Sequence, residues 1–130
     1  MENNQNNKTI ILVEDDQIIL RMYSKKFAKE GFKVIQAADG EAGWQAIQGT
    51  SPKPDVALLD IMLPKMNGFE LLEKIKASDT LKEMPVILLT NLGSGPIDKE
   101  KGRKLGAALY LIKSELTPAQ VVEQVKGVIK

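Results

Sequence analysis

Five short apolar runs alternate along the chain with longer segments of helical spacing. The runs span residues 9–13, 33–35, 55–59, 85–89 and 108–112. We predict each run as a β-strand, and the first, third and fourth are apolar without alternation, as is typical of parallel strands that helices cover on both faces. The connections are long enough for crossover helices. The pattern therefore predicts an α/β fold, a (βα)5 doubly wound sheet of parallel strands.

The connecting segments carry the periodicity and the boundary signals of helices. In the first of them an apolar face repeats every four residues, at Ile19, Tyr23 and Phe27. In the last segment, Thr117 and Gln120 have the spacing of a capping box, and Pro118 takes the first helical position. Residues 1–7 are short and polar, so we expect a disordered tail there and a single domain over residues 8–130.

The composition is that of an ordinary globular chain. Apolar residues make up 43% and charged residues 27% of the 130 residues, and the formal net charge is +1. This balance argues against a dedicated nucleic-acid binder, and no apolar run approaches the ~20 residues of a membrane helix. The chain has no Cys and no His, which excludes Ser-His-Asp and Cys-His catalysis and sites that bind metal through thiolate or imidazole. We expect a cytoplasmic protein without direct nucleic-acid contact or membrane insertion.

Charged and hydroxyl side chains stand where four of the predicted strands end. Glu14 and Asp15 follow the first strand, Asp60 the third and Lys113 the fifth, while Thr90 ends the fourth. The carboxyl ends of parallel strands share one edge of a sheet, so we expect these side chains to lie together. Carboxylates about 4 Å apart repel by roughly 4 kcal/mol at an effective dielectric near 20, and a hard dication relieves that repulsion. The sequence therefore predicts a Mg²⁺ site with oxygen ligands.

Asp60 is the strongest candidate for a nucleophile at this edge. A carboxylate can attack phosphorus and form an acyl phosphate. A bound metal, the Lys113 ammonium and the Thr90 hydroxyl would then neutralise charge on the phosphoryl oxygens. Asp15 and Asp60 could each supply one oxygen to the metal, and a backbone carbonyl after Asp60 could supply a third.

Four motifs, in this order, resemble those of the receiver domain of two-component response regulators. They are ILVEDD at 11–16, LDIMLP at 59–64 with MNG at 66–68, the pair Leu89-Thr90, and Gly106-Ala107 leading to YLIK at 110–113. The resemblance covers the chain from Lys8 to Lys130. The chain is also similar to the single-domain chemotaxis regulator, which has this fold. The resemblance implies a flavodoxin-like fold with strand order 2-1-3-4-5 and the function of a phosphoacceptor in a two-component phosphorelay.

The resemblance implies a role for each matching site residue. Asp60 accepts a phosphoryl group from a phosphohistidine on a partner, either a sensor histidine kinase or a histidine phosphotransfer protein. Glu14 and Asp15 are the acidic pair that binds Mg²⁺ or Mn²⁺ with Asp60, Asp15 as a direct ligand and Glu14 through water, and Met62 adds its backbone carbonyl. Lys113 binds a phosphoryl oxygen. The chain would then catalyse only its own phosphorylation and dephosphorylation, and would not act as an enzyme on other substrates.

The resemblance also implies a switch and an output surface. Thr90 and Tyr110 move together, and the face made by the fourth helix, the fifth strand and the fifth helix changes its affinity for a downstream output protein. Ala108 and Leu109 stand where the winged-helix transcription factors of this family tend to carry acids for their dimer face. We therefore expect a monomer, or at most a weak dimer when phosphorylated.

Four positions differ from the usual receiver pattern. Asn91 replaces a small residue after the Thr, and Ser114 replaces the Pro after the Lys. A cis peptide before a non-proline residue costs about 2.5 to 4 kcal/mol, so the Lys113-Ser114 bond is either held cis by its surroundings or trans with Lys113 aimed differently. Met62 and Leu92 are apolar where some relatives carry polar groups that orient a hydrolytic water, which predicts a long-lived acyl phosphate.

Two other functions remain open at this point. A phosphatase of the haloacid dehalogenase type also uses an Asp nucleophile at a strand end, but it needs a second Asp two residues later, where this chain has Met62. A receiver-like scaffold that works without phosphorylation is the other alternative.

Overall fold

In the computed structural model, which describes residues 8–91 and 96–129, five parallel strands form one sheet in the order β2-β1-β3-β4-β5. The strands are β1 (Thr9–Val13), β2 (Lys33–Ala37), β3 (Val56–Leu59), β4 (Val86–Thr90) and β5 (Leu109–Ile112). This order confirms the predicted doubly wound fold. The predicted tail at 1–7 lies outside the described residues.

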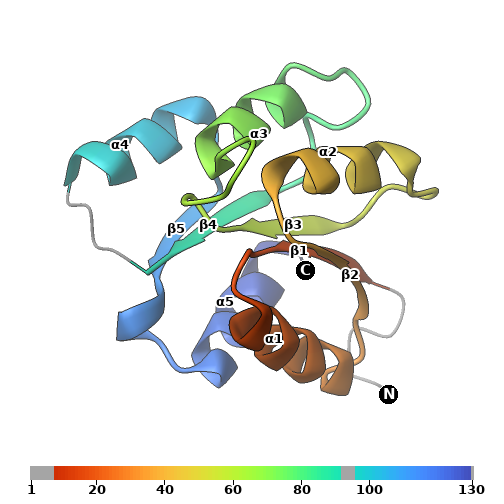
Figure 1. The fold of residues 1–130 in the computed structure, drawn as a ribbon, viewed down its shortest axis with the longest axis vertical. Helices are drawn as coiled ribbons and strands as arrows, with labels where there is room; N and C mark the ends of the chain where they lie inside the picture. The colour runs from red at the N-terminus through yellow and green to blue at the C-terminus, as the bar shows by residue number, and fades with distance from the viewer. Residues whose placement is uncertain (1–7, 92–95, 130) are drawn as a thin grey trace.

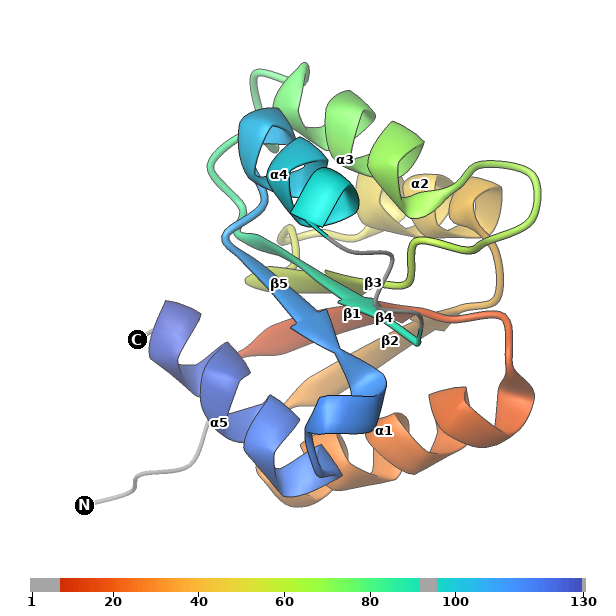
Figure 2. The same ribbon diagram turned by 90° about the vertical axis from the view of Figure 1, so that its left-hand side faces the viewer.

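Helices cover both faces of the sheet and give the molecule three layers (Figures 1 and 2). The helices are α1 (Gln17–Lys29), α2 (Gly40–Gly49), α3 (Gly68–Lys76), α4 (Pro96–Leu105) and α5 (Pro118–Ile129), with one 3₁₀ turn, η1 (Lys113–Glu115). Figure 2 shows α1 and α5 on one face and α2, α3 and α4 on the other. None of the helices in the described ranges is long and apolar enough to cross a membrane.

The central strands divide their side chains between two apolar clusters, one on each face of the sheet. In β1, Ile11 and Val13 pack in the cluster with α2 and α3, while Ile10 and Leu12 pack in the cluster with α1 and α5. Every residue of β3 and β4 is buried, whereas the edge strand β5 is only partly buried. This confirms the prediction that the apolar runs without alternation are strands covered by helices on both faces of the sheet.

The helix boundaries follow the capping signals of the sequence. The side chain of Asp16 accepts hydrogen bonds from the backbone N–H groups of Ile18 and Ile19 and caps α1. Thr117 and Gln120 form the predicted capping box of α5, which begins at Pro118. The third strand was predicted to begin at 55 and begins one residue later, at Val56, while Asp55 pairs with Thr9 through both its backbone N–H and its side chain.

Candidate functional site

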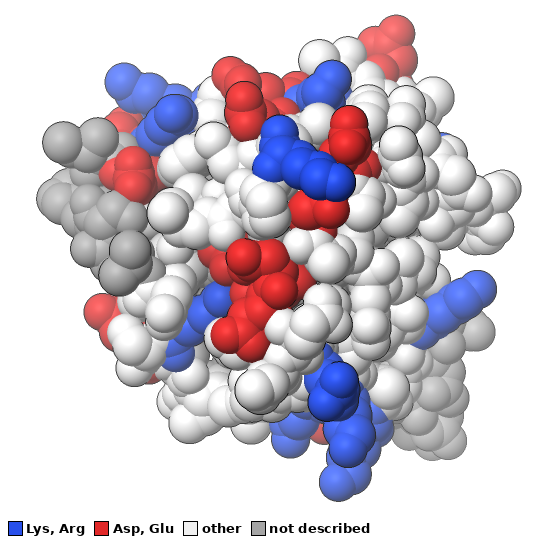
Figure 3. Space-filling view, viewed as in Figure 1, with Lys and Arg blue, Asp and Glu red and all other residues white. Residues whose placement is uncertain are grey.

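Three carboxylates meet at the carboxyl ends of β1 and β3. One oxygen from each of Glu14, Asp15 and Asp60 lies within 4.8 Å of the others. Asp15 is exposed, whereas Glu14 and Asp60 are only 7% and 6% exposed. In Figure 3 a group of acidic side chains lies near the middle of the face shown, which is this edge of the sheet. Side chains that are distant in sequence thus form one acidic pocket.

Lys113 enters this pocket from the start of η1, directly after β5. Its ammonium forms an ion pair with the Glu14 carboxylate and donates a hydrogen bond to Asp60 Oδ2 at 3.1 Å. The Lys113 side chain is 8% exposed, so these contacts are shielded from water. One cation therefore lies among three carboxylates, and the two that it contacts, Glu14 and Asp60, are nearly inaccessible to water.

Backbone groups fix the orientation of the two buried acids. Glu14 Oε2 accepts the N–H of Asp16 at 3.1 Å, and Asp60 Oδ1 accepts the N–H of Met62 at 3.1 Å. Gly68, at the start of α3, packs directly against the end of β3, and a Cβ atom there would lie 2.3 Å from the carbonyl oxygen of Asp60. A glycine is required at this position for α3 to approach the strand that carries Asp60.

The electrostatics of the pocket act most strongly on Glu14 and Lys113. Burial raises the pKa of Glu14, the charge of Asp60 raises it further, and the hydrogen bond from Lys113 opposes both. Burial alone would lower the pKa of Lys113, but its hydrogen bond to Glu14 and the charges of Asp60 and Glu14 raise that pKa above its usual value. Lys113 is therefore a permanent cation at neutral pH, and Glu14 binds a proton more tightly than an ordinary glutamate.

The other predicted site residues are in β4, in β5 and in the loop after Asp60. Thr90 ends β4 and is 1% exposed, and Met62, two residues after Asp60, is 65% exposed. Tyr110 is half-buried in β5, next to α4, where a Cβ atom on Gly102 would lie 3.4 Å from its ring. The Tyr110 hydroxyl oxygen is buried and has no hydrogen-bond partner among the described residues.

The structure shows two of the positions at which the chain differs from the usual receiver pattern, Ser114 and Asn91. Within the described ranges the one cis peptide is Ser51-Pro52, so the Lys113-Ser114 bond is trans, and Lys113 still contacts Glu14 and Asp60. Asn91 is exposed. The expectation about Leu92 lies outside the described residues.

Comparison with known proteins identifies the family. Residues 10–126 match the family model of the response regulator receiver domain. The chain belongs to the receiver domain family of response regulators. This receiver domain is 32% identical over 124 residues to the alkaline phosphatase synthesis transcriptional regulatory protein PhoP of Bacillus subtilis (strain 168), and the alignment covers 95% of the chain and 49% of that protein. The chain thus spans about half the length of this relative.

Solved structures agree with this assignment. A CheY-like response regulator receiver domain protein from Methanospirillum hungatei JF-1 superposes with a TM-score of 0.85 at 30% identity, covering 94% of this chain and 93% of that one. The Mn²⁺-bound form of response regulator Rcp1 superposes with a TM-score of 0.78 at 31% identity, covering 93% of this chain and 91% of that one. The receiver domain is the phosphoacceptor of a two-component system, which leaves no support for the phosphatase alternative.

Receiver domains as a class bind Mg²⁺ or Mn²⁺ through acidic residues, and they are generally non-catalytic signalling domains that interact with histidine kinases and output domains. The donor set of this chain fits such an ion, since Glu14, Asp15 and Asp60 supply hard oxygen ligands and Lys113 balances only part of their charge. The Asp15 side is exposed, so the site has an entry for the ion.

Two residues at the site were not predicted from the sequence. Gly68 was identified only as part of a motif, and its contact with the Asp60 backbone depends on how α3 crosses the sheet. Tyr23 was predicted only as one position of a buried helix face, but it lies beside Glu14 and Asp60. No local pattern could have shown either contact, because each depends on how a helix packs against the ends of the strands.

Proposed function

We propose that Asp60 is the residue that accepts the phosphoryl group. The observation that carries this proposal is the position of its carboxylate, which lies between two other acids and the Lys113 ammonium at the carboxyl edge of the sheet. Incubation with acetyl phosphate and Mg²⁺ tests it, since the intact mass should rise by one phosphoryl group. A mass that does not change would refute the proposal.

The donor in the cell is a phosphohistidine on a partner protein, a histidine kinase or a phosphotransfer protein in the cytoplasm. This chain has no His, so the imidazole belongs to the partner. A carboxylate oxygen of Asp60 attacks phosphorus, a P–O bond forms, the P–N bond breaks, and the imidazole leaves with the electron pair. Lys113 would neutralise a phosphoryl oxygen, and the Thr90 hydroxyl at the end of β4 would donate a hydrogen bond to another.

Asp15, Asp60 and the backbone carbonyl of Met62 are the proposed direct ligands of Mg²⁺ or Mn²⁺, and Glu14, whose two oxygens accept hydrogen bonds from Lys113 and Asp16, would act through water. When bound, the ion neutralises negative charge on the carboxylates and on the transferring phosphoryl group. The Asp60 carboxylate needs this help because Lys113 is the single cation in contact with the acids in the described part of the chain.

Mg²⁺ is expected to stabilise the wild-type protein against unfolding, by about 2.7 kcal/mol at a concentration of ~100 times its dissociation constant. Asp15→Asn removes one exposed ligand, so the variant should lose this response while folding at least as well as the wild type without metal. Urea unfolding with and without Mg²⁺ measures both. Asp16→Asn is the matched control, because Asn caps a helix as well as Asp does, and it should keep the full response.

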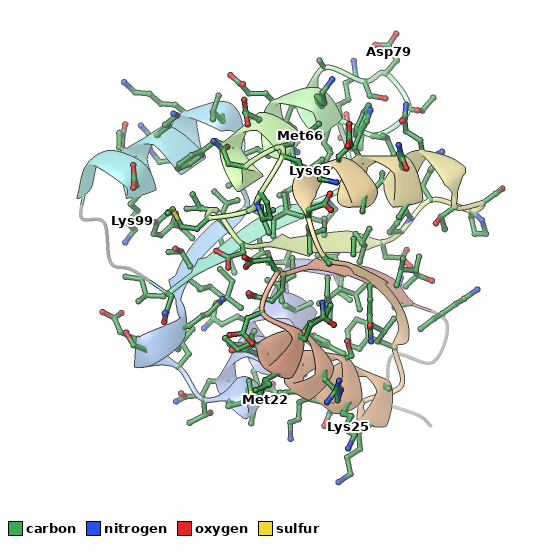
Figure 4. The ribbon with its side chains drawn as sticks, viewed as in Figure 1. Met22, Lys25, Lys65, Met66, Asp79 and Lys99 are labelled. Carbon is green, nitrogen blue, oxygen red and sulfur yellow. The ribbon has the colours of Figure 1, made fainter. Side chains whose placement is uncertain are left out.

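Thr90 and Tyr110 are the proposed switch, and α4, β5 and α5 form the proposed output face. Two observations support this assignment. The buried, unpartnered hydroxyl of Tyr110 disfavours the observed position of its side chain, which is the condition for a second position of similar energy. A groove of about 470 Å³ runs between α4 and β5 beside Tyr110, with Lys99 at its α4 side (Figure 4). An output protein that docks there would sense the position of Tyr110.

The acyl phosphate should be long-lived because the Met62 side chain, 65% exposed beside Asp60, offers no hydrogen bond to a hydrolytic water. Met62→Asn supplies such a group, so its decay in Mg²⁺ should be about tenfold faster, as one hydrogen bond of roughly 1.4 kcal/mol allows. Met62→Leu keeps an apolar side chain of similar size and should decay as slowly as the wild type. Wild-type decay within seconds would contradict this prediction.

A further inference from the structure

Tyr23 lines two hollows, one beside Glu14 and Asp60 and the other beside Lys113. It is on α1 and 5% exposed. On one side it lines an internal cavity of about 20 Å³, together with Glu14, Asp60 and the apolar side chains beneath them. On the other side it lines a surface hollow of about 210 Å³ that also contains Lys113, Asn91 and Ser114. Tyr23 is the one residue common to both linings, so its ring is the wall between the buried acids and this outer hollow.

The Tyr23 ring packs in the same apolar cluster as Leu20 and Phe27, and its polar end is a hydroxyl that can both donate and accept a hydrogen bond. The hydroxyl of a largely buried tyrosine usually binds a polar group or water. Burial raises the pKa of Tyr23, while the charge of Lys113 lowers it and the charge of Glu14 raises it, so both charged groups act on this hydroxyl. The hydroxyl therefore stays protonated at neutral pH and keeps its lone pairs available to an ammonium donor.

The Lys113 ammonium has one N–H group without an acceptor among the described residues. An ammonium has three N–H bonds, and the described structure gives it two acceptors, Glu14 and Asp60. Once Asp60 is phosphorylated, Lys113 must also serve a phosphoryl oxygen, so the ammonium has to shift from its resting position. Its long stem is flexible, and the outer hollow beside it leads to solvent.

We propose that Tyr23 is a positioning residue for phosphoryl transfer: its ring closes the outer side of the Lys113 stem, and its hydroxyl accepts a hydrogen bond from the ammonium as that group turns from Glu14 to the phosphoryl oxygen. This inference rests on the proposed phosphorylation of Asp60. The packing of the Tyr23 ring in the apolar cluster does not explain why the side chain carries a hydroxyl, and the proposed hydrogen bond gives that hydroxyl a function.

Tyr23→Phe removes the hydroxyl and keeps the ring. Its phosphorylation by acetyl phosphate should be about threefold to tenfold slower than that of the wild type, which is the factor that a hydrogen bond of about 0.5 to 1.5 kcal/mol supplies. Tyr23→Met, which also lacks the hydroxyl and fills most of the buried volume with an apolar side chain, should show at least as large a loss and covers the case in which the Phe variant fails to fold. Ser24, the next residue of α1, has a hydroxyl that accepts a hydrogen bond from Gln36 of β2, and Ser24→Ala should stay within twofold of the wild type.

A double-mutant cycle separates positioning from packing. In a Lys113→Ala background, Tyr23→Phe should change the rate less than twofold, because the ammonium that the hydroxyl positions is gone. In the resting protein labelled with ¹⁵N on lysine, Tyr23→Phe should shift the Nζ signal of Lys113 and leave that of Lys126, which pairs with Glu30, unchanged.

Two results would overturn the inference. One is a Tyr23→Phe protein that is phosphorylated as fast as the wild type, and the other is an equal loss with and without Lys113. Both leave the phosphorylation of Asp60 standing, whereas a wild-type protein that takes up no phosphoryl group would instead refute the proposed function.

Discussion

Asp60→Asn should take up no phosphoryl group from acetyl phosphate and Mg²⁺ under conditions that phosphorylate the wild type fully. An amide oxygen is a far weaker nucleophile than a carboxylate, and the substitution also removes one of the three clustered charges that attract the metal. The variant should fold, because Asn keeps the size of the side chain and the carbonyl oxygen that accepts the Met62 N–H. Intact mass over a time course measures the loss.

The matched control for this prediction is Asp79→Asn. Asp79 lies near the loop before β4, at the opposite edge of the sheet, and its side chain is 97% exposed (Figure 4). This variant should be phosphorylated at the wild-type rate. Uptake by Asp60→Asn at more than a trace of the wild-type rate would show that another residue accepts the phosphoryl group.

Lys113→Ala should slow phosphorylation by about 10²-fold and also destabilise the metal-free protein by about 3 kcal/mol. The rate falls because the cation that neutralises a phosphoryl oxygen is lost. Stability falls because Glu14 and Asp60, both nearly fully buried, lose the ammonium that pairs with them. Initial rates by mass spectrometry and urea unfolding give the two numbers.

The destabilisation should depend on pH with a definite sign. The pKa of Glu14 is already raised in the folded protein by burial and the charge of Asp60, and losing Lys113 raises it further. The folded variant therefore binds a proton more tightly than the unfolded chain, so its stability deficit should shrink as the pH falls from about 8 to about 5. Lys82→Ala, at an exposed pair with Asp79, should change stability by less than about 1 kcal/mol at any of these pH values. A deficit that grows on acidification would contradict this electrostatic account.

The sequence was most informative about the centre of the sheet. β1, β3 and β4 are continuous apolar runs because they are buried on both faces, so their pattern could be recognised without knowing their neighbours. Strand ends then placed Glu14, Asp15, Asp60 and Lys113 at one edge, since topology alone brings the carboxyl ends of parallel strands together. The outline of the site therefore followed from a one-dimensional pattern and a general rule.

Details that depend on the approach of two elements could not be predicted. The backbone after Lys113 was open to a cis or a trans peptide, and the trans bond with contacts to both acids became clear only from the packed structure. The position of Tyr23 in the lining of both hollows depends on where α1 lies against β1 and η1, which no local pattern records. The hydrogen bond from the Thr9 N–H to the Asp55 side chain, just before β3, is another detail that the sequence did not predict.

Direct localisation of the phosphoryl group tests the central claim, that Glu14, Asp15, Asp60 and Lys113 form one site in which a single carboxylate is esterified. Wild-type protein would be incubated with acetyl phosphate and Mg²⁺, reduced with borohydride, which converts an aspartyl phosphate to homoserine, and sequenced by tandem mass spectrometry. The account predicts homoserine at position 60 alone, and none when Mg²⁺ is chelated beforehand. Homoserine at another aspartate, or a chain that carries no modified residue, would contradict it.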